Sequence, residues 1–180
     1  MPTCGRRSSS SSYTSGIPVG EYVHVVKEDP SRRGLLFAGT ELGAWVSLDD
    51  GDSWQPLQLD LPTTSVRDFE VHGDDLIVGT FGRGIWVVDD ITPLRQLTDD
   101  VLRADAYLFQ PADAVIVNQG GDNGTPLQKD EPQAANAPEG AVIHYYLKSA
   151  ARGPVTLEIL DAAGKVVHTF TSQPPSAATP

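Results

Sequence analysis

Short apolar runs separated by turn residues dominate the middle of the chain, and their spacing is that of strands rather than of an amphipathic helix. From residue 20 onwards, four such runs follow one another at 21–28, 35–40, 44–47 and 53–57. Asp, Pro and Gly residues stand between them. Short β-prone runs with tight connections predict one four-stranded antiparallel sheet.

The same order of runs then returns further along the chain. Leu76–Thr80 repeats the pattern of Leu36–Thr40 at an offset of 40 residues, and Gly84–Val88 repeats that of Gly43–Ser47 at an offset of 41. A repeat of about 40 residues with four strands in each unit is typical of β-propeller blades. The sequence therefore predicts two blades within residues 20–98.

The second unit is predicted to begin with a strand at 66–72 and to close with a fourth strand at 94–97. Trp45 and Trp86 fall at equivalent positions of the two units, where repeated aromatic residues form the core between blades. A pair of blades leaves one face of this core uncovered. We therefore expect exposed apolar surface and association through the open blade face.

The connection after the third strand carries the pattern S-x-D-x-G-x-S-W, made by Ser47, Asp49, Gly51, Ser53 and Trp54. An Asp two residues before a Gly can accept backbone N–H bonds inside a tight turn, and the Gly supplies the positive φ that the turn needs. The tryptophan leaves the turn as a large apolar anchor. We interpret the pattern as a structural turn; the alternative is a carbohydrate site lined by the same residues.

The segments around the two units differ from them in composition. Residues 1–19 are Ser-rich and predicted to be disordered. Residues 99–139 contain several Gly and Pro residues and are predicted to be a linker. Residues 173–180 are predicted to be a frayed tail.

Strand-like runs return between residues 140 and 172. The run 141–148 alternates loosely, and the runs 155–160 and 166–170 flank a turn that contains Gly164. Two β-prone runs around such a turn predict a hairpin. Three strands are too few for a closed sandwich, so this part is predicted to be a partial one.

The charge, the cysteine count and the length of the apolar runs argue against several classes of function. The chain has 13 Lys and Arg against 24 Asp and Glu, and its net charge of −11 argues against partners such as nucleic acid or an anionic membrane surface. The single cysteine, Cys4, allows no internal disulfide and no cysteine-based metal cluster. No apolar run reaches the length of a transmembrane helix. Arg6 and Arg7 are followed by serines rather than by an apolar core, so no export signal is expected there.

Charged residues of the two units are candidates for a catalytic or binding site. Glycoside hydrolysis usually needs two carboxylates about 5–10 Å apart, and a sialidase-type site uses a Tyr nucleophile instead. Arg67, Arg83, Glu41 and Glu70 lie in the two units, but no spacing marks them as convergent, so we predict no catalytic residues. Arg83, between two glycines, is the leading candidate for a binding side chain near the propeller axis, with Arg67 and Glu70 as further candidates. An inter-blade ion pair is the alternative role for Arg83.

No metal or cofactor site is predicted. Asp49, Asp50 and Asp52 depart from the calcium-loop pattern because the glycine comes too early. The four histidines are scattered, without the spacing of metal ligands: His24, His72, His144 and His168.

The motifs together resemble a known family. The stretch Ser47–Trp54 matches the Asp-box, or bacterial neuraminidase repeat, and Gly79–Asp90 resembles the last blade of bacterial sortilin-like propellers. Those proteins resemble the Vps10 domain and are often labelled as glycosyl hydrolases. The runs Gly140–Lys148 and Val155–Phe170 resemble the Ig-like module that trails such propellers.

This resemblance covers residues 20–172 and implies an all-β chain with two terminal β-propeller blades followed by a partial Ig-like β-sandwich. It also implies a secreted or periplasmic location. We hypothesise a non-catalytic interaction module that binds protein or glycan partners through its loops. The alternatives are a fragment of a glycoside-hydrolase-like enzyme and a truncated reading frame without independent function.

Overall fold

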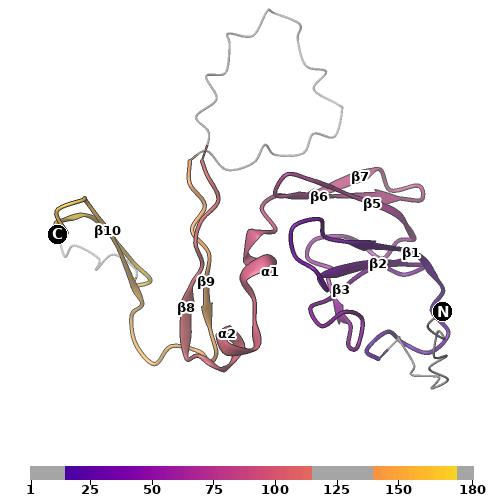
Figure 1. Cartoon of the computed structure of the whole chain (residues 1–180), viewed down its shortest axis with the longest axis horizontal. Helices are drawn as coiled ribbons and strands as arrows, with labels where there is room; N and C mark the ends of the chain where they lie inside the picture. Colours follow the sequence, from indigo (N-terminus) through magenta and orange to yellow (C-terminus); the bar gives the residue numbers. More distant parts are fainter. Residues whose placement is uncertain (1–14, 115–139, 174–180) are drawn as a thin grey trace, which may run out of the picture.

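The computed structural model describes residues 15–114 and 140–173. The predictions of disorder for residues 1–14, of a linker for 115–139 and of fraying for 174–180 lie outside the described residues. Among those described, strands in several small antiparallel sheets predominate and helices are few, so the fold is all-β. Figure 1 shows two stacked sheets at one end of the molecule, with the later strands beside and beyond them.

The first sheet has the four strands that the sequence predicts. Its order is β1-β2-β3-β4, formed by Val23–Glu28, Leu36–Thr40, Ala44–Ser47 and Gln55–Pro56. All its pairings are antiparallel. Pro56, which has no N–H to donate, lies in the edge strand β4, where a ladder hydrogen bond is not required.

The second sheet has three strands rather than the predicted four. It contains β5 (Val66–His72), β6 (Asp75–Thr80) and β7 (Ile85–Val88) in that order. The segment 94–97, predicted to be the fourth strand, instead lies mostly in the short helix α1 (Thr92–Gln96). That prediction was wrong.

Local chemistry explains the helix. Asp90 has a positive φ of 59° and turns the chain away from β7. Its carboxylate accepts hydrogen bonds from the backbone N and the hydroxyl of Thr92, at 3.0 and 2.6 Å. Pro93 follows in the first turn of α1, where its missing N–H costs nothing but would have interrupted a strand ladder.

The two sheets share one apolar core. Alternating side chains of β2 and β3 meet those of β5, β6 and β7, and the rings of Phe37 and Phe69 lie 6.1 Å apart. Phe37 is fully buried and Phe69 is 1% exposed. Burial of side chains of this size stabilises a fold by about 1.5–3 kcal/mol each, so the stacking of the sheets accounts for most of the apolar burial.

The remaining elements form two separate two-stranded sheets. Helix α2 (Asp99–Arg103) leads to β8 (Ala106–Leu108), which pairs with β9 (Tyr145–Leu147), and β10 (Thr156–Leu160) pairs with β11 (Val166–Thr171). The predicted hairpin around Gly164 is therefore present. The predicted sandwich over 140–172 is not confirmed, because β9 pairs with β8 and every residue of β11 is exposed.

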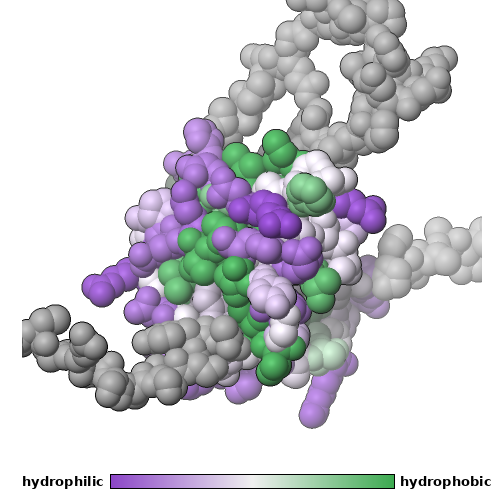
Figure 2. All heavy atoms as spheres, turned by 90° about the vertical axis from the view of Figure 1, so that its right-hand side faces the viewer, coloured by the Kyte–Doolittle hydropathy of each residue, from purple (hydrophilic) through white to green (hydrophobic). Residues whose placement is uncertain are grey.

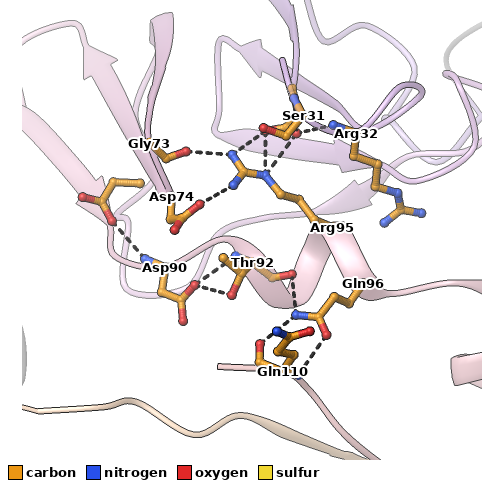
Figure 3. Close-up of polar contacts among 11 residues, drawn as sticks. Ser31, Arg32, Gly73, Asp74, Asp90, Thr92, Arg95, Gln96 and Gln110 are labelled. Atoms are coloured by element: carbon orange, nitrogen blue, oxygen red, sulfur yellow. Dashed lines mark hydrogen bonds and ion pairs between the residues drawn. The ribbon is translucent and has the colours of Figure 1, made fainter. Parts of the chain in front are cut away.

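A buried ion pair ties the two sheets together at one end (Figure 3). Asp29 directly follows β1, and its side chain is fully buried. The guanidinium of Arg95, in α1, binds both carboxylate oxygens of Asp29 at 2.9–3.1 Å. The same guanidinium donates to Asp74 and to the Gly73 carbonyl in the β5–β6 turn. The hydrogen bond to Asp29 is the main cause of a raised pKa at Arg95.

A second arginine reinforces this junction. The backbone N–H groups of Ser31 and Arg32 donate to the Asp29 carboxylate at 3.0 and 2.6 Å. The side chain of Arg32 donates to the carbonyls of Leu94 and Leu48. The turn after β1 is thereby bound to both α1 and the end of β3.

We predict that Arg95→Ala lowers the free energy of unfolding by about 3 kcal/mol, because it leaves the Asp29 carboxylate buried without its counter-ion. The measurement is urea unfolding followed by tryptophan fluorescence. Arg103→Ala is the matched control, since it removes only exposed ion pairs with Asp99 and Asp100; its cost should stay below about 1 kcal/mol. Equal effects of the two substitutions would contradict the role given to Arg95.

Candidate functional site

Residues Ser47–Trp54, called the box below, form a closed hydrogen-bonded turn between β3 and β4. The hydroxyl of Ser47 donates to Asp49 Oδ1 at 2.8 Å and accepts from the Gly51 N–H at 2.9 Å. Asp49 also accepts from the N–H of Ser53 at 2.9 Å and from its hydroxyl. Asp50 and Gly51 both have positive φ, at 60° and 89°. The side chains of Ser47, Asp49 and Ser53 therefore bind one another and the backbone of the same turn.

Trp54 anchors this turn on the outer face of the first sheet. It is 7% exposed and clusters with Ile17 and Ala38. The backbone N–H of Trp54 donates to the Ser15 carbonyl at 2.7 Å. At Gly16 a Cβ would lie 2.0 Å from the Trp54 carbonyl oxygen, so only glycine fits there. These contacts hold the box against the outer face of the first sheet.

The hydrogen bonds of the box also act on the charge of Asp49. Partial burial disfavours its charged form, but the hydrogen bonds from Ser53 and Ser47 outweigh this effect and lower its pKa. A carboxylate held in this way stabilises the turn only while it is ionised.

A second group of side chains, most of them polar, meets at the opposite end of the strands from the Asp29–Arg95 pair. We call it the loop-end cluster; it consists of His24, Glu41, Ser65, Arg67 and Phe81. Glu41 follows β2 and Phe81 follows β6, so equivalent turns of the two units contribute to it. The other three members lie on β1, on β5 and just before β5. No local sequence pattern indicates this convergence, because it depends on how the two sheets stack.

Glu41 is the centre of the loop-end cluster. Its Oε2 lies 2.6 Å from His24 Nε2, 3.2 Å from the Ser65 hydroxyl and 3.6 Å from Arg67 Nη2. The hydrogen bond from His24 is the largest cause of a lowered pKa at Glu41, and Ser65 and Arg67 lower it further. Glu41 is thus held as a carboxylate.

This arrangement is unsuited to nucleophilic catalysis. A Ser–His–carboxylate triad requires the serine to bond the imidazole, but Ser65 donates to Glu41 instead. The second imidazole nitrogen of His24 lies 3.4 Å from Arg67 Nη1. Both contacts of His24 are satisfied by one tautomer, with the proton on Nε2. The cluster therefore fixes the orientation of its side chains rather than activating one of them.

Exposed apolar side chains lie at the same end of the strands as these charges. Phe81 is 73% exposed, and the guanidinium carbon of Arg67 lies 5.3 Å from the centre of its ring. Tyr22 is 75% and Leu42 51% exposed, and the Tyr22 carbonyl accepts from the Glu41 N–H at 3.1 Å. Figure 2, which views this end of the strands, shows hydrophobic and strongly hydrophilic residues side by side.

Two other sequence-based candidates, Glu70 and Arg83, are not members of the cluster. Glu70 forms an ion pair with Lys27 at 2.8 Å, which joins β5 to β1, and this contact is the main cause of the lowered pKa of Glu70. Arg83 is exposed in the β6–β7 turn, and its side chain pairs with no described residue. Of the three candidates, only Arg67 belongs to the loop-end cluster.

A cavity of about 460 Å³ lies between the first sheet, β7 and the segment before β9. The walls of this cavity are largely apolar. The buried Nε2 of His144 lies 3.3 Å from Asp90 Oδ2, but the two atoms do not form a hydrogen bond. The residues that line the cavity include Leu57, Leu61, Val78, Trp86, Val88, Val142 and His144.

Two further kinds of site are absent from the described residues. No group of three or more His, Cys, Asp or Glu there could hold a metal ion. No helix in that part of the chain is long and apolar enough to span a membrane. Comparison with family models, curated proteins and solved structures found no match to the chain.

The Asp49 contacts predict a pH-dependent stability. Because its folded-state pKa is below the usual value of about 3.9, Asp49 stabilises the fold above that pH, and this contribution is lost as the pH falls through the folded pKa. Asp49→Ala should cost about 1–2 kcal/mol at neutral pH and flatten the loss of stability below about pH 4. Urea unfolding at several pH values measures both effects.

Asp52→Ala is the control for this experiment. Asp52 belongs to the same turn and is exposed, but its carboxylate accepts no hydrogen bond from a described residue. Its removal should leave both the stability at neutral pH and the acid profile close to those of the unaltered protein. An equal loss for Asp49→Ala and Asp52→Ala would contradict the hydrogen-bonding account.

Proposed function

We propose that the protein is a non-catalytic interaction module that binds a protein partner through the loop-end surface. We define this surface as the loop-end cluster together with Tyr22, Leu42 and Arg83. The observation that carries the proposal is an exposed Phe81 packed against Arg67, beside two further exposed apolar side chains. Aromatic residues and arginine are enriched among the residues that dominate binding energy at protein interfaces.

The proposal includes the architecture. We propose that the two sheets are terminal blades of a sortilin-like β-propeller and that residues 140–172 belong to an Ig-like module. The repeated strands, their stacking and the pairing of Lys27 on β1 with Glu70 on β5 support the blade assignment. In a propeller, such turns form a common rim on which binding residues gather.

The geometry favours binding over glycoside hydrolysis. A glycosidase needs one carboxyl group with a raised pKa to act as the general acid. The described carboxylates with a resolved shift, Glu41, Asp49 and Glu70, all have lowered pKa values. Each is also occupied by hydrogen bonds or an ion pair, which leaves it poorly placed to donate a proton.

The chemistry of the surface indicates the kind of segment it binds. Phe81, Tyr22 and Leu42 offer apolar contacts, and Arg83 carries a charge without a described partner. A guanidinium suits a carboxylate, which it can bind through two parallel hydrogen bonds. We therefore propose a peptide segment in which an acidic residue lies next to an apolar one.

We predict that the protein selects such peptides from a displayed random-peptide library. Synthetic versions should bind about tenfold more weakly to Phe81→Ala, because a central aromatic contact contributes more than about 1 kcal/mol. Arg83→Ala should act mainly on peptides that contain the acidic residue. Fluorescence anisotropy of labelled peptides measures these affinities.

Phe170→Ala is the matched control, because Phe170 is also an exposed aromatic residue but lies on β11, away from the surface. The affinity of this variant for the peptides should equal that of the unaltered protein. A parallel glycan array tests the alternative partner: glycan binding lost on Phe81→Ala, without peptide selection, would replace the protein partner by a glycan. The proposal would be overturned if the protein bound neither peptides nor glycans. It would also be overturned if Phe81→Ala and Phe170→Ala lowered the affinity equally.

A further inference from the structure

The strand register allows a residue-by-residue comparison of the two sheets. Val26 pairs with Ala38 in the first sheet, and Phe69 pairs with Val78 in the second. Since Ala38 and Val78 are equivalent in the repeat, Val26 is the counterpart of Phe69. In the same way Val23, opposite Thr40, is the counterpart of Val66, opposite Thr80.

These counterparts differ sharply in exposure. Phe69 and Val66 are 1% and 0% exposed, because the first sheet covers them. Val26 and Val23 are 53% and 39% exposed. Together with the partly buried Leu36 and Trp45 they form what we call the head face of the first sheet.

The head face is also hollowed. Ile17 and Trp54 pack against part of it, and a groove of about 310 Å³ runs beside them. The groove is almost wholly apolar, and its lining includes Ile17, Val23, Val26, Leu36, Ala38 and Trp54.

On the outer face of the second sheet, the residues of the second unit are exposed and their counterparts in the first sheet are buried. Ala44 and Val46 of β3 are 2% and 7% exposed, because the second sheet covers them. Their counterparts on β7, Ile85 and Val87, are 75% and 53% exposed. With Ile77, which pairs with Val87, they form what we call the tail face.

The protein itself shows what covers such faces. Inside the chain, Trp86 and Phe69 of the second sheet pack on the face of the first sheet that carries Ala44 and Val46. In the repeat, the head face of the first sheet is equivalent to the face of the second sheet that covers the first sheet. The tail face of the second sheet is equivalent to the face of the first sheet that is covered. Each molecule thus exposes both halves of an interface that it already contains once.

We propose that a second copy of the chain docks head to tail, with the head face of one copy on the tail face of the next. The contact repeats the internal stacking of the two sheets. It is heterologous, because different surfaces of the two copies meet, so further copies can add until a ring closes or a filament grows. The net charge of −11 opposes this association, and salt should therefore strengthen it.

Two single substitutions separate the halves of the interface. Val26→Glu places a charge on the head face and leaves the tail face intact, whereas Ile85→Glu does the reverse. Both positions are largely exposed within one molecule, so the folded monomer tolerates them. Each variant alone should associate at least about 100-fold more weakly than the unaltered protein, because a charge without a partner is costly to bury.

The decisive sample is the mixture of the two variants. Each copy of Ile85→Glu keeps a head face and each copy of Val26→Glu keeps a tail face, so the mixture should form a 1:1 dimer that grows no further. Sedimentation velocity of the full chain, with one variant carrying a fluorescent label, measures this dimer. Val87→Glu should behave as Ile85→Glu does.

Val167→Glu is the control, since Val167 is 66% exposed on β11, outside both faces. It should associate as the unaltered protein does. A monomeric unaltered protein at every concentration and salt level would overturn the proposal. So would association of either variant alone at full strength, which would indicate a symmetric interface, or a mixture of the two that remains monomeric.

Discussion

The buried pair of Asp29 and Arg95 is the contact on which the arrangement of the two sheets depends. A fully buried carboxylate is costly unless a charge and several donors compensate it, and here one guanidinium and two backbone N–H groups do so. Because Arg95 also holds the β5–β6 turn, one side chain joins α1 to both sheets. The shared apolar core supplies the bulk of the attraction, and this pair selects the relative placement.

That placement explains why polar residues converge at the other end of the strands. With β1 beside β5, the turn after β2 and the turn after β6 point the same way, and Glu41 and Arg67 meet although they belong to different units. Each turn alone carries one or two exposed side chains. When the sheets stack, the two turns together form a mixed apolar and charged surface. The contact between His24 and Glu41 fixes the orientation of its side chains.

The sequence predicted those parts of the fold that depend on local pattern. The first sheet, the strands of the second up to β7, the hairpin around Gly164 and the turn made by Ser47–Trp54 all follow from alternation, repeats and turn residues. The docking of α1 on the first sheet could not be predicted in this way, because Arg95 binds Asp29 across a separation of 66 residues. The loop-end cluster was missed for the same reason, since its contacts cross between units. A signal for α1 was nevertheless present in Asp90 and Pro93, which favour a turn and a helix start over a continued strand.

The central claim is that the two sheets form one cooperative body that positions the loop-end surface. Native-state hydrogen exchange, resolved by residue, tests it most directly. The account predicts that the slowest amides of β2, β3, β5 and β6 open with the same free energy, since loss of either sheet exposes the core of both. Exchange of β5 and β6 at a clearly lower free energy than β2 and β3 would contradict it, because the sheets would then open independently.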